Sequence, residues 1–299
     1  MNRQSPQMRE IITRLRNNSP PMATDALTHR ARLAAIPPRP PDVPIDLDDL
    51  NLDGIQAERL TPRGLTRAVV IYLHHGGFVA GSAASCRHFA ARLAVSAAVE
   101  VLVPDYRLAP EHPFPAAIED SAAAYRHVLA ERGSEQPVVL AGISAGAGLA
   151  VSTMLVLRDH GYPLPRCAVL LSPWADLTLS SGTMTAPDSG DPTDSLRMSQ
   201  WAAHDYLGEV PPETPLASPV FAQLEHLPPL HIEVGTAERF LDDARALAER
   251  SALAGVLTEL QVIDGAIHGF PQNAPDTPEG HTALRRITQF VSRHISEGS

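Results

Sequence analysis

Cysteine is scarce in this sequence, with two residues in 299. Cys86 and Cys167 lie far apart, which excludes a disulfide framework and predicts reduced or buried thiols. No apolar run approaches the length of a membrane span, and the first six residues lack the apolar core of a signal peptide. We therefore expect a cytoplasmic protein without a membrane span.

Positive charge is also in short supply. The chain has 24 Lys and Arg against 34 Asp and Glu, a formal net charge of −10. This balance argues against nucleic acid or an anionic membrane as a partner. The hydrophobic fraction of 44% and the chain length fit one soluble α/β domain with a large core.

Short apolar runs alternate with helical patterns from Ile55 onward. Near-continuous apolar strands in such an alternation predict a mainly parallel sheet that helices cover on both faces. The expected strands cover residues 68–73, 99–104, 138–141, 166–173, 230–234 and 260–263. The expected helices cover residues 116–131, 239–254 and 281–295, with one more after the strand at 138–141.

Two segments fall outside this alternation. Residues 1–35 carry two amphipathic pieces, and the prolines of residues 37–41 then form an extended linker. We expect residues 1–45 to be a cap packed on a catalytic domain of residues 46–299, although a plain N-terminal extension fits as well. Residues 176–217 contain one expected helix, at 196–207, and such a long excursion between strands is often a lid over a site.

The residues 142–146 read G-I-S-A-G and stand between an apolar strand and a helical pattern. In that context G-x-S-x-G predicts a nucleophile elbow with Ser144 at its apex. So tight a turn strains the serine backbone and leaves no room for side chains two residues before and after it. The pattern alone also fits an ordinary glycine-rich turn, so the assignment of Ser144 depends on motifs elsewhere in the chain.

Residues 74–77 read H-H-G-G and follow the first apolar strand. Glycines there can present backbone N–H groups to a developing oxyanion without filling the pocket. We expect Gly76, Gly77 and Ala145, the residue after the nucleophile, to supply these donors. The alternative is a tight glycine turn with no chemical role.

A base and an acid are expected on later loops of the same sheet edge. His268 follows the last expected strand, and Glu238 follows the strand before it, which gives the order serine, acid, histidine. Glu238 would orient the imidazole and stabilise its cation. Asp242 could substitute for it, but is expected to cap the helix that follows.

Together these motifs resemble the hormone-sensitive-lipase-like family of α/β-hydrolases, the bacterial esterases with an H-G-G-G motif. The resemblance covers about residues 68–295, including D-Y-R-L-A-P-E at residues 105–111 and H-G-F at residues 268–270. It implies an α/β-hydrolase fold with a helical cap, formed by the N-terminal residues and 176–217, that shapes the acyl pocket. It also implies that Ser144, Glu238 and His268 are the triad and that Gly76, Gly77 and Ala145 form the oxyanion hole.

The chain departs from this family at three positions. His75 replaces the first glycine of the motif, Ile143 stands where many members have Asp, and Glu238 stands where many have Asp. We expect His75, Phe78 and Ile143 to lie at the substrate pocket, with Ile143 serving local packing. The D-Y-R-L-A-P-E block is expected to be a turn stabilised by charge pairs.

These features predict a serine carboxylester hydrolase acting on small short-acyl esters through an acyl-enzyme, without metal or organic cofactor. One alternative is a deacetylase or lactone hydrolase for one secondary metabolite, in which His75 or a cap residue would assist amide cleavage. Another is a ligand-binding protein on the same scaffold. A homodimer through an edge strand and a nearby helix is also compatible with the resemblance.

Overall fold

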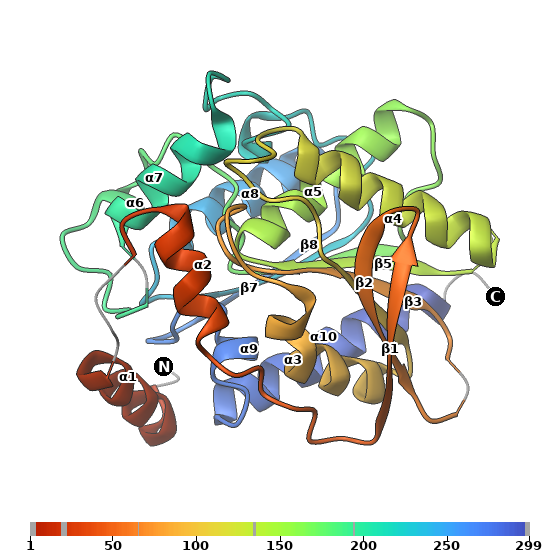
Figure 1. Cartoon of the computed structure of the whole chain (residues 1–299), viewed down its shortest axis with the longest axis horizontal. Coiled ribbons are helices and arrows are strands. Elements are labelled where there is room, and N and C mark those ends of the chain that lie inside the picture. Colours follow the sequence, from red (N-terminus) through yellow and green to blue (C-terminus); the bar gives the residue numbers. More distant parts are fainter. Residues whose placement is uncertain (1–3, 19–22, 65, 134–135, 194, 297–299) are drawn as a thin grey trace.

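The computed structural model describes residues 4–18, 23–64, 66–133, 136–193 and 195–296. Within these residues eight strands form one sheet in the order β1-β2-β4-β3-β5-β6-β7-β8 (Figure 1). β1 and β2 pair antiparallel with each other, as do β2 and β4, whereas the strands from β4 through β3 to β8 are parallel. The expected mainly parallel sheet is confirmed. The strands are β1 (Ile45–Leu52), β2 (Ile55–Pro62), β3 (Val69–Leu73), β4 (Glu100–Pro104), β5 (Val138–Ile143), β6 (Cys167–Leu171), β7 (Leu230–Gly235) and β8 (Thr258–Ile263).

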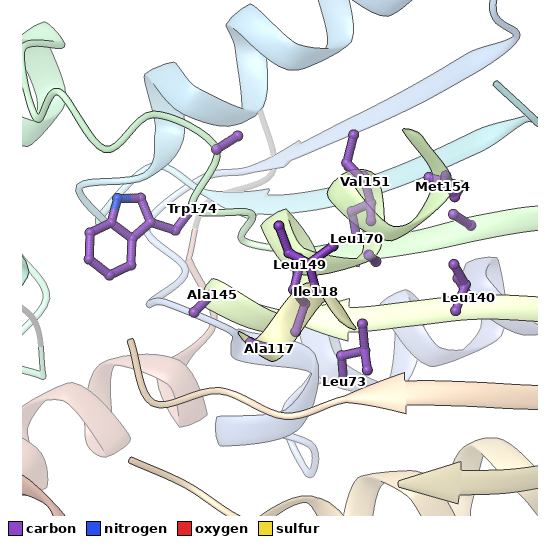
Figure 2. Close-up of a cluster of buried hydrophobic side chains, with 14 of the residues drawn as sticks. Leu73, Ala117, Ile118, Leu140, Ala145, Leu149, Val151, Met154, Leu170 and Trp174 are labelled. Carbon is purple, nitrogen blue, oxygen red and sulfur yellow. The ribbon is translucent and has the colours of Figure 1, made fainter. Parts of the chain in front are cut away.

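Helices cover both faces of the sheet, as Figure 1 shows. One layer is α3 (Ala83–Ala97), α9 (Phe270–Asn273) and α10 (Pro278–Ser296); the other is α4 (Ala116–Arg132), α5 (Ala145–Asp159) and α8 (Leu241–Leu253). Every residue of the five strands from β3 to β7 is buried, and alternate side chains join opposite clusters. Figure 2 shows part of one cluster, in which Leu73, Leu140 and Leu170 of neighbouring strands gather with Ile118 and Leu149.

The hairpin of β1 and β2 and the helix α3 were not expected. β1 contains four acidic or amide residues and lies at the sheet edge, so it lacks the apolar run of a buried strand. The turn residues Asp53 and Gly54 both have positive φ, a conformation typical of hairpin turns. α3 is rich in alanine and begins with a capping box between Ser82 and Ser85, a signal that the apolar pattern alone does not reveal.

The N-terminal residues pack on the body of the protein. In α1 (Pro6–Asn18), Met8 and Ile12 are buried in the same cluster as residues of α10. In α2 (Ala26–Ala34), Arg30 donates hydrogen bonds to the carbonyl oxygens of Val79 and Ala109 and pairs with Glu111. Glu111 belongs to the D-Y-R-L-A-P-E turn, so its charge pair links α2 to the loop after β4.

Residues 176–217 contain α6 (Gly182–Thr185) and α7 (Leu196–Leu207), followed by a 3-10 turn at Pro219–Phe221. The Trp201 Nε1–H of α7 donates to the carbonyl oxygen of Ala23, and α7 lies beside α2 in Figure 1. The two segments expected to form the cap are therefore in contact. The division into a cap segment of residues 1–45 and a catalytic domain of residues 46–299, with a cap insertion at about residues 176–217, stays a prediction.

None of the helices in the described ranges combines the length and the apolar composition needed to cross a bilayer.

Candidate active site

Ser144 lies at the turn between β5 and α5, with φ 59° and ψ −125°. This backbone conformation is strained for a residue with a side chain. A Cβ on Gly142 would lie 2.2 Å from the carbonyl oxygen of Gly146, and one on Gly146 would lie 2.1 Å from that of Leu73. Glycine is therefore required two residues before and two residues after Ser144, as predicted from the sequence.

The backbone N–H groups of the two glycines after β3 and of the residue after Ser144 have no acceptor among the described residues. Within the described part of the chain, no protein group accepts a hydrogen bond from the N–H of Gly76, Gly77 or Ala145. Gly76 has φ +121°, and a Cβ there would lie 2.0 Å from the carbonyl oxygen of Ala80. The geometry requires glycine at this position and leaves its donor available to an oxygen in the pocket.

His268 and Glu238 meet at the carboxyl edge of the sheet. The distance between His268 Nδ1 and Glu238 Oε2 is 2.7 Å, and Glu238 is buried. The other oxygen, Oε1, accepts from Gly235 N–H and from Ser172 Oγ, each at 2.7 Å. With Oε1 occupied by donors, Oε2 accepts the Nδ1 proton of His268, which leaves Nε2 unprotonated in the neutral ring.

Ser172 and Asp191 are site residues that the sequence analysis missed. Ser172 Oγ joins the loops after β7 and β8, because it donates to Glu238 and accepts from Gly269 N–H at 2.9 Å. Asp191 Oδ2 accepts from His268 N–H at 2.5 Å, so a residue of the 176–217 excursion holds the loop that carries His268. The position of Ser172 directly after a buried strand was a usable signal, whereas Asp191 had none.

One cavity of about 1410 Å³ opens over Ser144 and His268, and both residues line it. His75, Gly76, Gly77 and Ile143 also belong to its wall. Further wall residues come from α1, α2, the proline-rich linker and α7, so the two expected cap segments cover the site.

The structure places Phe78 differently from the expectation. It is not among the described residues that line the cavity, and it is buried under Tyr206, with ring centroids 3.9 Å apart, and beside Trp174. Its positive φ of 65° turns the side chain into the packing between the loop and α7. Phe78 therefore packs against Tyr206 and Trp174 and does not itself line the described cavity wall.

His74 and His75, in the loop after β3, both have a lowered pKa. Burial, with the nearby positive charge that His74, His268 or His29 would carry, lowers the pKa of His75 to about 3. Burial, opposed by a hydrogen bond to the His75 carbonyl, lowers the pKa of His74 to about 4. The ring of His74 stacks on Tyr106 at 4.0 Å, and the Tyr106 hydroxyl donates to the His74 carbonyl oxygen. His74 thus serves the loop that carries the glycine donors.

The acidic residues after Glu238 accept hydrogen bonds from other parts of the chain. Asp242 Oδ2 accepts from Thr183 N–H at 2.9 Å and lies in the first turn of α8, near the helix-start role expected for it. Asp243 is buried, and its Oδ2 accepts from Ala175 and Asp176 N–H groups at 3.0 Å. Burial raises the pKa of Asp243 to about 8, although the hydrogen bond from Ala175 opposes this.

Asp243→Asn is expected to fold normally, because an amide oxygen can accept the same two bonds that a protonated carboxyl accepts. Asp243→Ala should lower the free energy of unfolding by about 2–5 kcal/mol, since it leaves two buried donors unpaired. Between pH 5 and 8 the folded protein keeps a proton on Asp243 that the unfolded chain releases, so wild type should lose stability with rising pH relative to Asp243→Asn. Urea unfolding of the three proteins across this range measures both effects; a stability difference between wild type and Asp243→Asn that does not change with pH would contradict the raised pKa.

No group of three or more His, Cys, Asp or Glu side chains among the described residues is arranged to hold a metal ion.

Comparison with known proteins agrees with this geometry. Residues 70–272 match the model of a family with the alpha/beta hydrolase fold. An acetyl-hydrolase of Streptomyces hygroscopicus is 40% identical over 246 residues, which cover 81% of each chain. The esterase LipI of Mycobacterium tuberculosis is 33% identical over 275 residues, covering 86% of this chain and 85% of LipI.

The solved structure of an esterase from the bacterial hormone-sensitive lipase family matches with a TM-score of 0.89 at 39% identity. The match covers 98% of this chain and 99% of that one. The expected fold is confirmed, and the sheet order, the elbow and the cover of helices all fit it. The chain belongs to the α/β-hydrolases, among their bacterial hormone-sensitive-lipase-like members.

Proposed function

We propose that this protein is a serine carboxylesterase that cleaves small short-acyl esters with Ser144, His268 and Glu238. The observation that carries the proposal is the cavity wall, which holds a strained serine, a carboxylate-bound histidine and glycine N–H groups that no described residue pairs. Acyl transfer through a serine nucleophile requires these groups: a nucleophile, a base with its orienting acid, and donors for the oxyanion.

In the first half-reaction Ser144 Oγ attacks the ester carbonyl while His268 Nε2 takes its proton. The carbonyl oxygen becomes an oxyanion that the N–H groups of Gly76, Gly77 and Ala145 stabilise. Glu238 keeps the proton on Nδ1 and stabilises the imidazolium. His268 then donates its proton to the alcohol oxygen, the ester C–O bond breaks, and the acyl group stays on Ser144.

In the second half-reaction water takes the place of the alcohol. His268 removes a proton from water, the resulting hydroxide attacks the acyl carbonyl, and the same donors hold the second oxyanion. Return of the proton to Ser144 Oγ releases the carboxylic acid and restores the enzyme.

The short-acyl preference rests on the 40% identity to an acetyl-hydrolase over most of both chains. It is tested with p-nitrophenyl acetate, butyrate and octanoate. We expect kcat/KM to be highest for acetate or butyrate. A maximum at octanoate would contradict the preference while leaving the esterase assignment intact.

His75 bears on the alternative of amide cleavage. Because the pKa of His75 is about 3, its ring is neutral at pH 5–9 and cannot serve as a cationic acid for an amine leaving group. In His75→Gln we therefore expect the profile of kcat/KM against pH to fall toward low pH with the same midpoint as in wild type, measured above pH 5. The maximum value of kcat/KM should change by less than about tenfold. Rate profiles on an O-acetyl and an N-acetyl substrate measure this. A shifted midpoint, or selective loss of N-acetyl cleavage, would show that His75 titrates in the reaction.

Two further proposals concern the whole molecule. We place the protein in the cytoplasm, which the buried, unbridged Cys86 and Cys167 support. We also propose a homodimer through the outer strand β8 and helix α8, where Leu253, Leu257 and Val262 are exposed. Sedimentation at micromolar concentration tests the dimer, and a monomer mass would overturn it.

A further inference from the structure

The loop of residues 188–193 touches both of the loops that carry the base and the acid. It lies between α6 and α7, in the excursion that separates β6 from β7. Its Asp191 accepts a hydrogen bond from His268 N–H in the loop after β8. Its Gly190 lies against Ala237 in the loop after β7, since a Cβ on Gly190 would be 3.7 Å from the Cβ of Ala237. A segment outside the sheet therefore contacts the main chain on which the catalytic groups are mounted.

Asp191 is a buried carboxylate that accepts from three donors. It is 5% exposed. Oδ1 accepts from Thr193 N–H at 2.8 Å and from Thr193 Oγ1 at 2.6 Å, while Oδ2 accepts from His268 N–H at 2.5 Å. A carboxylate can accept on both sides, whereas an amide can accept on only one. Because a buried charge is costly unless donors satisfy it, this arrangement favours a carboxylate at this position.

Asp188 shows what the same loop needs for its own turn. Its Oδ1 accepts from Gly190 N–H at 2.8 Å, the same bond to the residue two positions later that Asp191 makes to Thr193. Asp188 makes this bond while it is exposed. The feature that distinguishes Asp191 is the bond of its second oxygen to His268.

The main chain of His268 depends on such bonds for its position. Gly265 and Gly269, on either side of it, have φ of 66° and 59°, and glycine can adopt many other backbone conformations. Asp191 accepts from the His268 N–H, and Asn273 Nδ2 donates to the His268 carbonyl oxygen at 2.8 Å. Loss of the first bond would let the imidazole shift relative to the nucleophile. A misplacement of about 1 Å can cost on the order of 10²-fold in rate.

The N-terminal segment supports the same two loops from outside. Arg16 Nη2 of α1 donates to the carbonyl oxygen of Gly190, directly before Asp191, at 3.0 Å. Gln4 Nε2, just ahead of α1, donates to the carbonyl oxygen of Gly265 at 2.6 Å. Segments from both ends of the expected cap therefore bond to the loops around the catalytic histidine.

We propose that Asp191 is a positioning residue of the hydrolytic reaction. Its second carboxylate oxygen holds the His268 main chain where the ring can take the proton of Ser144, and α1 helps to keep the 188–193 loop in place. This inference rests on the esterase function proposed above. It makes the excursion a determinant of the rate as well as a cover over the cavity.

Asp191→Asn is designed to remove this one bond. The two donors of Thr193 will draw the amide oxygen to the Oδ1 position, so the amide NH₂ group faces His268 N–H and cannot accept from it. We expect kcat for p-nitrophenyl acetate to fall by about 10²-fold, with KM within about threefold of wild type because the cavity is unchanged. A raised KM with the wild-type kcat would place the effect in substrate binding and would overturn the proposal.

Asp188→Asn is the matched control. It removes one negative charge from the same loop, and its amide oxygen can still accept from Gly190 N–H. It should keep kcat within about threefold of wild type. An equal loss of kcat in the two variants would assign the effect to the charge of the loop and would overturn the role of Asp191.

The rate and the extent of labelling by a fluorophosphonate separate a misplaced base from a loss of folded protein. In Asp191→Asn one equivalent should still attach to Ser144, about 10²-fold more slowly than in wild type. Labelling of only a fraction of the protein at the wild-type rate would show that the variant is merely less folded, and would overturn the proposal. Asp191→Ala removes the acceptor without an opposing amide, so it should show the same slow and complete labelling and replaces Asp191→Asn if that variant does not fold.

The outcomes separate this inference from the function on which it rests. Wild-type kcat in the Asp191 variants would overturn the positioning role and leave the esterase standing. A wild-type protein that neither hydrolyses p-nitrophenyl acetate nor takes up the label on Ser144 would overturn the esterase itself, and with it the reaction in which Asp191 is placed.

Discussion

Replacing Ser144 by alanine is expected to lower kcat/KM for p-nitrophenyl acetate by roughly 10⁵-fold or more, close to the rate without a nucleophile. The hydroxyl is the only atom removed, and it makes no capping hydrogen bond to α5, so the fold should be kept. The remaining N–H donors and the cavity can still bind the ester, which predicts a much smaller change in KM than in kcat. Steady-state kinetics measures the loss, after subtraction of the rate at which the ester hydrolyses without enzyme.

Ser152→Ala is the matched control for this variant. Ser152 is a buried serine of α5, the helix that begins directly after Ser144, and its Oγ donates to the carbonyl oxygen of Gly148. It is not among the described residues that line the cavity, so its loss should leave activity near the parent level. If Ser144→Ala hydrolysed the ester at the parent rate, the nucleophile would have to be another residue.

Glu238→Gln should lower kcat by about 10⁴-fold, with little change in stability. Gly235 N–H and Ser172 Oγ both donate to Oε1, so the glutamine oxygen will take that position. The amide nitrogen then faces His268 Nδ1 and donates to it, which moves the ring proton to Nε2. A protonated Nε2 cannot accept the proton of Ser144, and the attack loses its base.

Asp242→Asn provides the comparison for Glu238→Gln. Asp242 is the nearby carboxylate that the sequence also allowed as the acid, but its Oδ2 accepts from Thr183 N–H and its Oδ1 lies 3.4 Å from Arg245 Nη1. We expect its substitution to leave kcat within about threefold of wild type, as for surface substitutions in general. Equal losses in the two variants, or a larger loss in Asp242→Asn, would move the role of the acid away from Glu238.

Much of the fold could be predicted because local pattern and global structure agree at the centre of the sheet. The strands from β3 to β7 are buried on both faces, so each reads as an apolar run. The antiparallel hairpin of β1 and β2 escaped this rule because an edge strand can be polar along its length. Its Asp53-Gly54 turn was the more informative signal.

Placing the candidate residues depended on the rule that parallel strands end at one edge. Ser144, Glu238 and His268 each follow a strand, and the structure brings Glu238 and His268 into contact and both Ser144 and His268 into one cavity. Asp191 could not be found in this way, because it comes from an excursion whose path depends on tertiary packing. The place of Phe78 also could not be predicted from its position after a strand. Its positive φ directs the side chain away from the cavity and into a buried contact with Tyr206.

The charge state of His75 is a further property that no local pattern contains. From the sequence, an imidazole beside the oxyanion donors could be an acid for a leaving amine. In the structure burial and neighbouring histidines lower its pKa to about 3, which makes it a neutral part of the wall. His29, one of these histidines, lies more than forty positions away in the chain.

The central claim is that Ser144 is a nucleophile activated by His268 and Glu238. Its most direct measurement is labelling of the native enzyme with a fluorophosphonate, followed by mass spectrometry of the intact protein and its peptides. One equivalent should attach to the peptide that contains Ser144, in step with the loss of esterase activity, and Glu238→Gln should label far more slowly. Full activity without label on Ser144, or inactivation with the label on another residue, would contradict the claim.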